Sequence, residues 1–147
     1  MRLLFLVLAF LTTAALFTGS DGGPGVTYVG RDKVGAELAG QVKGPLVKAS
    51  DLLVTAVHRA ENGRVELHEK ETDIFYIVDG EATFVTGGKM VGGKVKSPGQ
   101  WLGTDILGGQ VHHLVKGDVI VIPAGIPHWF KEVPHSVSYF AVKVLKP

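Results

Sequence analysis

The stretch Gly117–Phe130, GDVIVIPAGIPHWF, decides how the rest of the chain can be interpreted. Its Val119–Ile122 segment is β-branched throughout, which is typical of a strand covered on both faces. Pro123 ends that strand because proline has no N–H for a ladder, and the Pro-Ala-Gly-Ile-Pro sequence indicates a tight turn. His128 therefore enters the next strand directly after a rigid corner. A side chain held in this way suits a metal ligand or a catalytic base.

The composition predicts one globular, β-rich domain. The chain has 147 residues, of which 46% are hydrophobic and 20% charged, and its 20 glycines suit many turns. Cysteine is absent, so disulfides, thiolate metal sites and cysteine nucleophiles are excluded. There are 15 basic and 14 acidic residues without a basic block. We therefore expect neither nucleic acid nor an anionic membrane surface as a partner.

Residues 1–20 have the layout of a secretory signal peptide. Arg2 is followed by an almost wholly apolar stretch, Leu3–Phe17, and then by the small residues of the sequence TGS. The apolar stretch has 15 residues. It would be about 22 Å long as a helix, against a hydrocarbon core of about 30 Å. Cleavage is thus favoured over an uncleaved anchor. We expect an exported protein, periplasmic or extracellular, whose mature chain starts near Asp21 and does not associate stably with the membrane.

The mature chain is expected to divide into a lead-in with a short helix at residues 21–45 and a β domain at residues 46–147. Arg31–Ala39 has a helical pattern, and Gly40 marks its end. Roughly nine or ten short strands then follow at spacings of about 8–12 residues, which favours a sandwich or barrel over a βαβ fold. The stretch Glu61–Gly63 is typical of a hairpin, and Asp79-Gly80 of a tight turn between two strands.

The segment that ends in His128 resembles the second sequence motif of the cupin family. That motif is Gly, five residues, Pro, one residue, Gly, two residues, His, and here it is Gly117, Pro123, Gly125 and His128 without a gap. The first cupin motif is His-any-His, three or four residues, Glu, six residues, Gly. The stretch ELHEKETDIFYIVDG matches it with substitutions. In particular, the chain resembles small exported bacterial cupins with an ELHEK-type first motif. The resemblance implies an all-β fold, the cupin double-stranded β-helix or jelly-roll barrel.

Cupins bind one divalent metal inside the barrel, usually through three histidines and one glutamate. By this resemblance Glu66 takes the first histidine position, His68 the second, Asp73 the glutamate position and His128 the last histidine position. Glu66 and His68 are two residues apart on an expected strand, so they face the same side. The implied cofactor is Mn, Fe, Ni or Zn, with open positions for a substrate, and Glu66 is a fourth ligand or a general base. A register that starts at His68 is weaker, because it would place the ammonium of Lys70 at a ligand position.

Each of these residues also has a purely structural interpretation. Glu66 can instead pair with Arg59 or Arg64, and Asp73 can serve the chemistry of a turn. His128 can be a hydrogen-bonded structural histidine. Metal binding and structural support therefore remain open at these positions.

Phe75, Trp129 and His112 are the residues expected to line a substrate cavity. Aromatic side chains are first of all core packing, and adjacent strand residues such as His112 and His113 face opposite ways. The leading functional hypothesis is a metal-dependent enzyme that acts on a small organic molecule, with oxygenase, isomerase or lyase chemistry left open. The alternatives are a non-catalytic module that binds a small ligand or a metal, and an exported domain with a packed barrel.

A homodimer is a further implication of the resemblance, because cupins commonly pair through strand exchange. The segment Val137–Val144 is the strand that would serve.

Overall fold

The computed structural model describes residues 25–146, so the expected signal peptide lies outside the described residues. This part of the chain holds one helix and twelve strands. The helix is not long and apolar enough to cross a membrane. The elements in chain order are α1 (Arg31–Leu38), β1 (Val47–Lys48), β2 (Leu52–Arg59), β3 (Val65–His68), β4 (Glu71–Thr86), β5 (Lys89–Val91), β6 (Lys94–Ser97), β7 (Gln100–Gly103), β8 (Asp105–Leu107), β9 (Gln110–Val115), β10 (Val119–Ile122), β11 (His128–Glu132) and β12 (Val137–Leu145).

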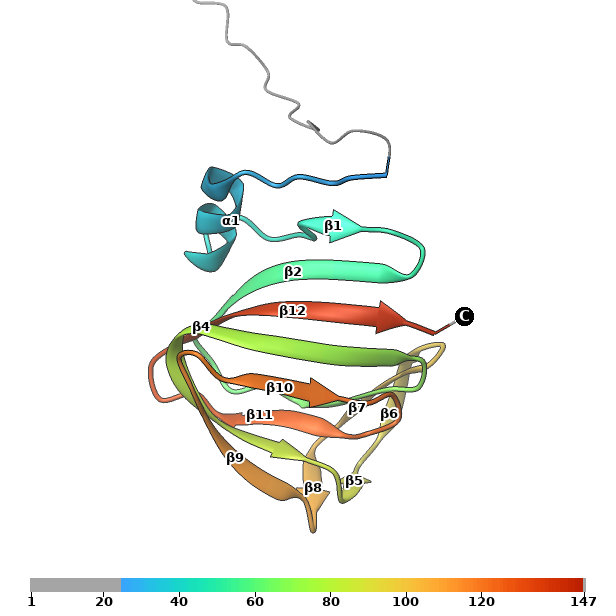
Figure 1. The fold of residues 1–147 in the computed structure, drawn as a ribbon. Coiled ribbons are helices and arrows are strands. Elements are labelled where there is room, and N and C mark those ends of the chain that lie inside the picture. Colours follow the sequence, from blue (N-terminus) through green and yellow to red (C-terminus); the bar gives the residue numbers. More distant parts are fainter. Residues whose placement is uncertain (1–24, 147) are drawn as a thin grey trace, which may run out of the picture.

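Two antiparallel sheets face one another across the barrel (Figure 1). The first has the order β1-β2-β12-β4-β10. The second has the order β9-β4-β11-β3-β7-β6, and the short pair β5-β8 stands apart from both. β4 is the strand that belongs to both sheets, and α1 packs near β2. The all-β jelly-roll barrel with a short N-terminal helix is confirmed.

The tight turn expected at Asp79-Gly80 is wrong. Both residues lie inside β4, which runs without interruption for 16 residues. Gly80 has a φ of 77°, and here the strand leaves the first sheet and enters the second. A Cβ at this position would lie 2.0 Å from the carbonyl oxygen of Ser136. Glycine is therefore required for the corner of the barrel, where two backbones approach closely.

The hairpin expected around Glu61–Gly63 is also wrong, because β2 and β3 on either side of it do not pair. β2 pairs with β1 and β12, whereas β3 pairs with β11 and β7. The connection instead crosses from one sheet to the other. It is held there by Gly63 N–H, which donates to the carbonyl of Phe130 at 2.8 Å, and by Asn62 Oδ1, which accepts from the N–H of Val133 at 2.8 Å.

The space between the sheets is filled by aromatic and aliphatic side chains. Phe84 is completely buried, and the ring of Phe75 lies 5.9 Å from it, 5.8 Å from Phe130 and 5.2 Å from Tyr139, measured between centroids. Phe75 and Phe84 also contact the ring of His128, at 6.3 and 6.1 Å. The aromatic core thus forms one wall of the region that holds the expected site.

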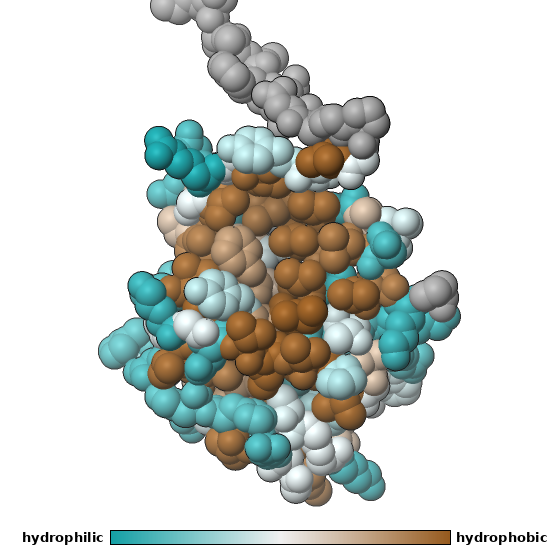
Figure 2. Space-filling view, in the orientation of Figure 1, coloured by the Kyte–Doolittle hydropathy of each residue, from teal (hydrophilic) through white to brown (hydrophobic). Residues whose placement is uncertain are grey.

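The outer face of the first sheet is apolar as well, as Figure 2 shows over β2, β12, β4 and β10. Val119 and Val121 are 61% and 55% exposed, so the expectation that this strand is covered on both faces is wrong for the described chain. β12 lies between β2 and β4, and both of its edges are paired within the chain. The segment Val137–Val144 is therefore not free for strand exchange in this fold, and the homodimer stays a prediction.

Gly80→Ala is expected to destabilise the protein far more than Gly117→Ala. Both glycines have a positive φ, 77° and 96°. At such angles an L side chain costs about 1–2 kcal/mol. Only at Gly80 would the new Cβ also meet backbone, since nothing lies within 4 Å of it at Gly117. Urea unfolding should show a loss of about 1–2 kcal/mol for Gly117→Ala and a larger loss, or no folded protein, for Gly80→Ala. Equal losses would contradict the close-packed corner.

Candidate metal centre

The four side chains expected to form the site come from β3, β4 and β11. Glu66 and His68 alternate on β3 and face the same side, and His128, the first residue of β11, is the direct cross-strand partner of Glu66. Asp73 lies on β4, which pairs with β9, β10, β11 and β12 but not with β3. No hairpin between β3 and β4 therefore brings Asp73 to Glu66 and His68. The closure of the barrel brings it there instead.

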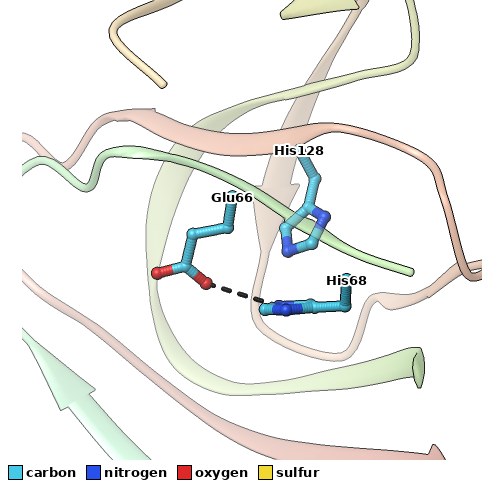
Figure 3. A group of neighbouring side chains, drawn as sticks. All are labelled: Glu66, His68 and His128. Atoms are coloured by element: carbon cyan, nitrogen blue, oxygen red, sulfur yellow. Dashed lines mark ion pairs between the residues drawn. The ribbon is translucent and has the colours of Figure 1, made fainter. Parts of the chain in front are cut away.

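The structure brings these four side chains together, and Figure 3 shows three of them converging. His68 Nε2 lies 3.3 Å and His128 Nε2 3.4 Å from the same oxygen, Asp73 Oδ2. Glu66 Oε2 is 3.6 Å from His68 Nε2. Ligand atoms that each lie about 2.1 Å from one ion are about 3.0–3.4 Å apart at octahedral or tetrahedral positions. The distances from Asp73 to the two histidines fall in this range. The ligand atoms of Glu66, His68 and His128 lie within 4.8 Å of one another, so these three side chains also have a spacing that could hold one metal ion.

Both imidazoles present an unpartnered nitrogen to this cluster. The Nε2 atoms of His68 and His128 are buried and have no hydrogen-bond partner. An unsatisfied buried polar atom costs about 1–3 kcal/mol, so a group that satisfies both atoms at once would stabilise the fold. A divalent cation is such a group, and a donor set of imidazoles and carboxylates suits Mn, Fe, Ni or Zn. The residues present therefore fit a metal.

The remaining ring nitrogens are held by hydrogen bonds that orient the two histidines. His68 Nδ1 donates to the side-chain carbonyl of Gln100, whose amide donates to Glu71 Oε1 at 2.8 Å. His128 Nδ1 donates to the backbone carbonyl of Ile126 at 3.1 Å. These bonds fix the tautomer that leaves each Nε2 lone pair facing the cluster. The sequence analysis missed Gln100, for which no local signal exists, and Glu71, which stands three residues after His68.

Lys143 lies on the far side of Asp73 and was also missed. Its Nζ is 2.7 Å from Asp73 Oδ1 and 3.0 Å from Glu71 Oε2. Asp73 is only 1% exposed, and a carboxylate buried to that degree needs a positive partner. The ammonium group binds one carboxylate oxygen and leaves the other facing the two imidazoles. Lys143 is opposite Asp73 in the β12–β4 register, a pairing that motif spacing does not reveal.

Comparison with known proteins identifies the family of the chain. Residues 36–147, well over half of the chain, match the cupin family. The chain belongs to the cupin family. No curated protein matches the sequence.

Several solved structures are similar to this cupin. A protein from Bacillus halodurans is 13% identical, with 70% of this chain and 69% of that chain covered and a TM-score of 0.51. A protein with a double-stranded β-helix domain from Klebsiella pneumoniae is 17% identical, with 71% and 76% covered and a TM-score of 0.49. The DMSP lyase DddQ from Ruegeria pomeroyi is 18% identical, with 65% and 39% covered and a TM-score of 0.46. At these identities the likeness concerns the fold alone.

Burial and neighbouring charges shift the pKa values in the cupin site. The nearby imidazole of His68 lowers the pKa of Glu66 to about 2, although burial opposes this. Burial lowers the pKa of His68, but the nearby carboxylates of Glu66 and Asp73 outweigh this effect, so the pKa is raised. The pKa of His128 is lowered, mainly by burial. At neutral pH the cluster therefore offers an ionised Glu66 and a neutral His128, both of which suit a metal.

A cavity of about 30 Å³ adjoins the cluster, with Glu66 and His128 in its lining. Phe75 and Trp129 also line it, and Trp129 is fixed by its indole N–H, which donates to the carbonyl of Gly63 at 2.8 Å. His112 is not found in this lining. It lies on β9, and its Nε2 is 2.8 Å from the hydroxyl of Thr86. His112 was expected to line the substrate cavity, but it does not line this one.

Lys143→Met is expected to destabilise the metal-free protein by about 3–5 kcal/mol, because it leaves the buried carboxylate of Asp73 without a positive partner. Added Mn²⁺ or Zn²⁺ should then raise the Tm of the variant more than that of the wild type, since the cation replaces the lost charge. Lys96→Met, on the exposed strand β6, is the matched control and should change little. A Lys143→Met protein as stable as the wild type without metal would show that Asp73 does not depend on Lys143.

Proposed function

We propose that this cupin is exported, binds one divalent metal, Mn, Fe, Ni or Zn, through His68, Asp73, His128 and Glu66, and acts on a small organic molecule. One observation carries the metal part of the proposal: two buried, unpartnered Nε2 atoms face the same oxygen of Asp73. Membership of the cupin family supports a small-molecule ligand or substrate. Export and the identity of the metal stay predictions.

The residues of the site divide into those that hold the metal and one that can also act on a substrate. His68, His128 and Asp73 are nearly fully buried, which suits permanent ligands. The side chain of Glu66 is 42% exposed, so it is either a fourth ligand or a base that accepts a proton at a carboxylate oxygen. A divalent metal held there supplies Lewis-acid activation of a substrate oxygen, and Mn or Fe also supplies redox chemistry. Oxygenase, isomerase and lyase reactions all fit this set of groups.

A non-catalytic module that binds a metal or a small ligand is the second candidate. It is favoured by the size of the cavity, about 30 Å³, which holds only roughly two or three water molecules at about 10–15 Å³ each in this conformation. Water-proton relaxation of the Mn²⁺-loaded protein separates the two candidates. Fast-exchanging water at the metal supports the enzyme, because a coordination position is then open to a substrate. A closed coordination shell supports the module.

Metal content tests the proposal directly. The mature chain, purified without chelators, is expected to hold one divalent metal per chain, and His68→Ala and His128→Ala should each abolish it. Loss of a group that only supports a ligand already costs about 10–100-fold in metal affinity, and loss of the ligand itself should cost more. His135→Ala is the matched control, because His135 is exposed and lies in the turn before β12, and it should leave the metal content unchanged. A wild-type protein free of metal, or histidine variants that retain it, would refute the metal site.

The metal affinity is expected to rise with pH through the titration of His68 and then to level off. A raised pKa means that His68 keeps its proton above the usual 6.5, so metal and proton compete there. Glu66→Gln removes a partner that raises this pKa, and the rise should move to lower pH even if the maximal affinity falls. Isothermal titration with Zn²⁺ between pH 5 and 8 gives both quantities. An unchanged midpoint in the variant would contradict the coupling of Glu66 to His68.

A further inference from the structure

Arg59, the last residue of β2, lies where two spaces meet. It lines the cavity of about 30 Å³ beside His128, and it also lines a cleft of about 930 Å³ outside that cavity. The cleft runs along β2, which β1 covers only at Leu53 and Val54. Of the residues that line the two spaces, Arg59 alone belongs to both. Arg59 therefore marks the place where the outer cleft approaches the cavity beside the metal centre.

The guanidinium of Arg59 has no acidic partner within residues 25–146, and its Nε atom is buried without a hydrogen-bond partner. The carboxylate that lines the same cavity, Glu66, pairs with His68 instead. The Cζ atom of Arg59 lies 5.0 Å from the centroid of the Phe130 ring, which positions the group. Burial raises the pKa of Tyr139, and the positive charge of Arg59 opposes this rise. A positive group that is half-buried without a counter-charge favours an anionic ligand.

We propose that Arg59 binds the carboxylate of a small organic anion whose other end, a hydroxyl or carbonyl oxygen, reaches the metal centre. The inference rests on the proposed function for that second contact. A guanidinium group matches a carboxylate with two parallel N–H···O bonds, which fixes the orientation of the anion as well as its affinity. Arg64, exposed on the rim of the same cavity, adds a second positive charge that attracts anions.

The place of Arg59 also bears on entry to the site. The cavity, about 30 Å³, has space for roughly two or three water molecules at about 10–15 Å³ each. A larger anion needs the cavity to widen, and Arg59 is the residue that lines both the cavity and the outer cleft.

Glycolate and glycolamide test this inference, because they have nearly the same shape and only glycolate is charged. Binding of each to the Mn²⁺-loaded mature chain is measured by isothermal titration. The wild type should bind glycolate at least about tenfold more tightly than glycolamide, and Arg59→Gln should lower the glycolate affinity by about tenfold or more, the usual effect of losing charge-assisted hydrogen bonds. The glycolamide affinity should not change. Arg59→Lys, which keeps the charge but loses the planar fork, should fall between the two.

Arg31→Gln is the matched control, since Arg31 lies on α1 with a side chain that is 97% exposed, and it should leave glycolate binding unchanged. Metal content is measured on every variant first. A wild type without metal overturns the proposed function and, with it, the two-ended anion. A fully loaded Arg59→Gln protein that binds glycolate as the wild type does overturns the role of Arg59 alone. If Arg59→Gln does not fold, equal glycolate affinity in Arg59→Lys and the wild type overturns the paired-bond geometry.

Discussion

The geometry of the candidate metal centre depends on the buried carboxylate of Asp73. One of its oxygens faces the imidazoles of His68 and His128, and the other bonds to the ammonium group of Lys143. The carboxylate is almost completely buried, next to an aromatic core, so each of these contacts has a large effect on its free energy. The strands that carry the partners, β3, β11 and β12, must therefore keep their positions around β4. A polar cluster of this kind is tolerated in a barrel interior only when every member is satisfied.

The polar atoms of the cluster do not all have a bonding partner unless a further group binds there. Gln100 and the backbone carbonyl of Ile126 take up the outer ring nitrogens, whereas the inner nitrogens of His68 and His128 have no partner. Such an arrangement resembles the preorganisation of an enzyme site, in which the surrounding shell orients ligand atoms before anything binds. The ordering of these side chains is part of the folding of the chain, so a metal that binds there has little conformational entropy left to lose.

Local patterns predicted the parts of the site that depend on a few consecutive residues. The proline and glycine spacing before His128 indicates a rigid corner, and the two-residue spacing of Glu66 and His68 places them on one face. Gln100 and Lys143 could not be found in this way, because they are 32 and 70 residues from their partners and meet them through strand register. Asp79-Gly80 shows the opposite error: a strong local turn signal was overridden by a barrel corner that only the packed sheets require.

The continuity of β4 through both sheets has a mechanical consequence. Its first half carries Asp73 in the ladder with β12, and its second half carries Phe84 in the ladder with β11 and β9. Neither layer can peel away while the other stays intact, because the shared strand would have to break at its bend. Opening events large enough to free the buried carboxylate should therefore coincide with global melting. Amide protons along the whole strand are expected to exchange at one common, slow rate.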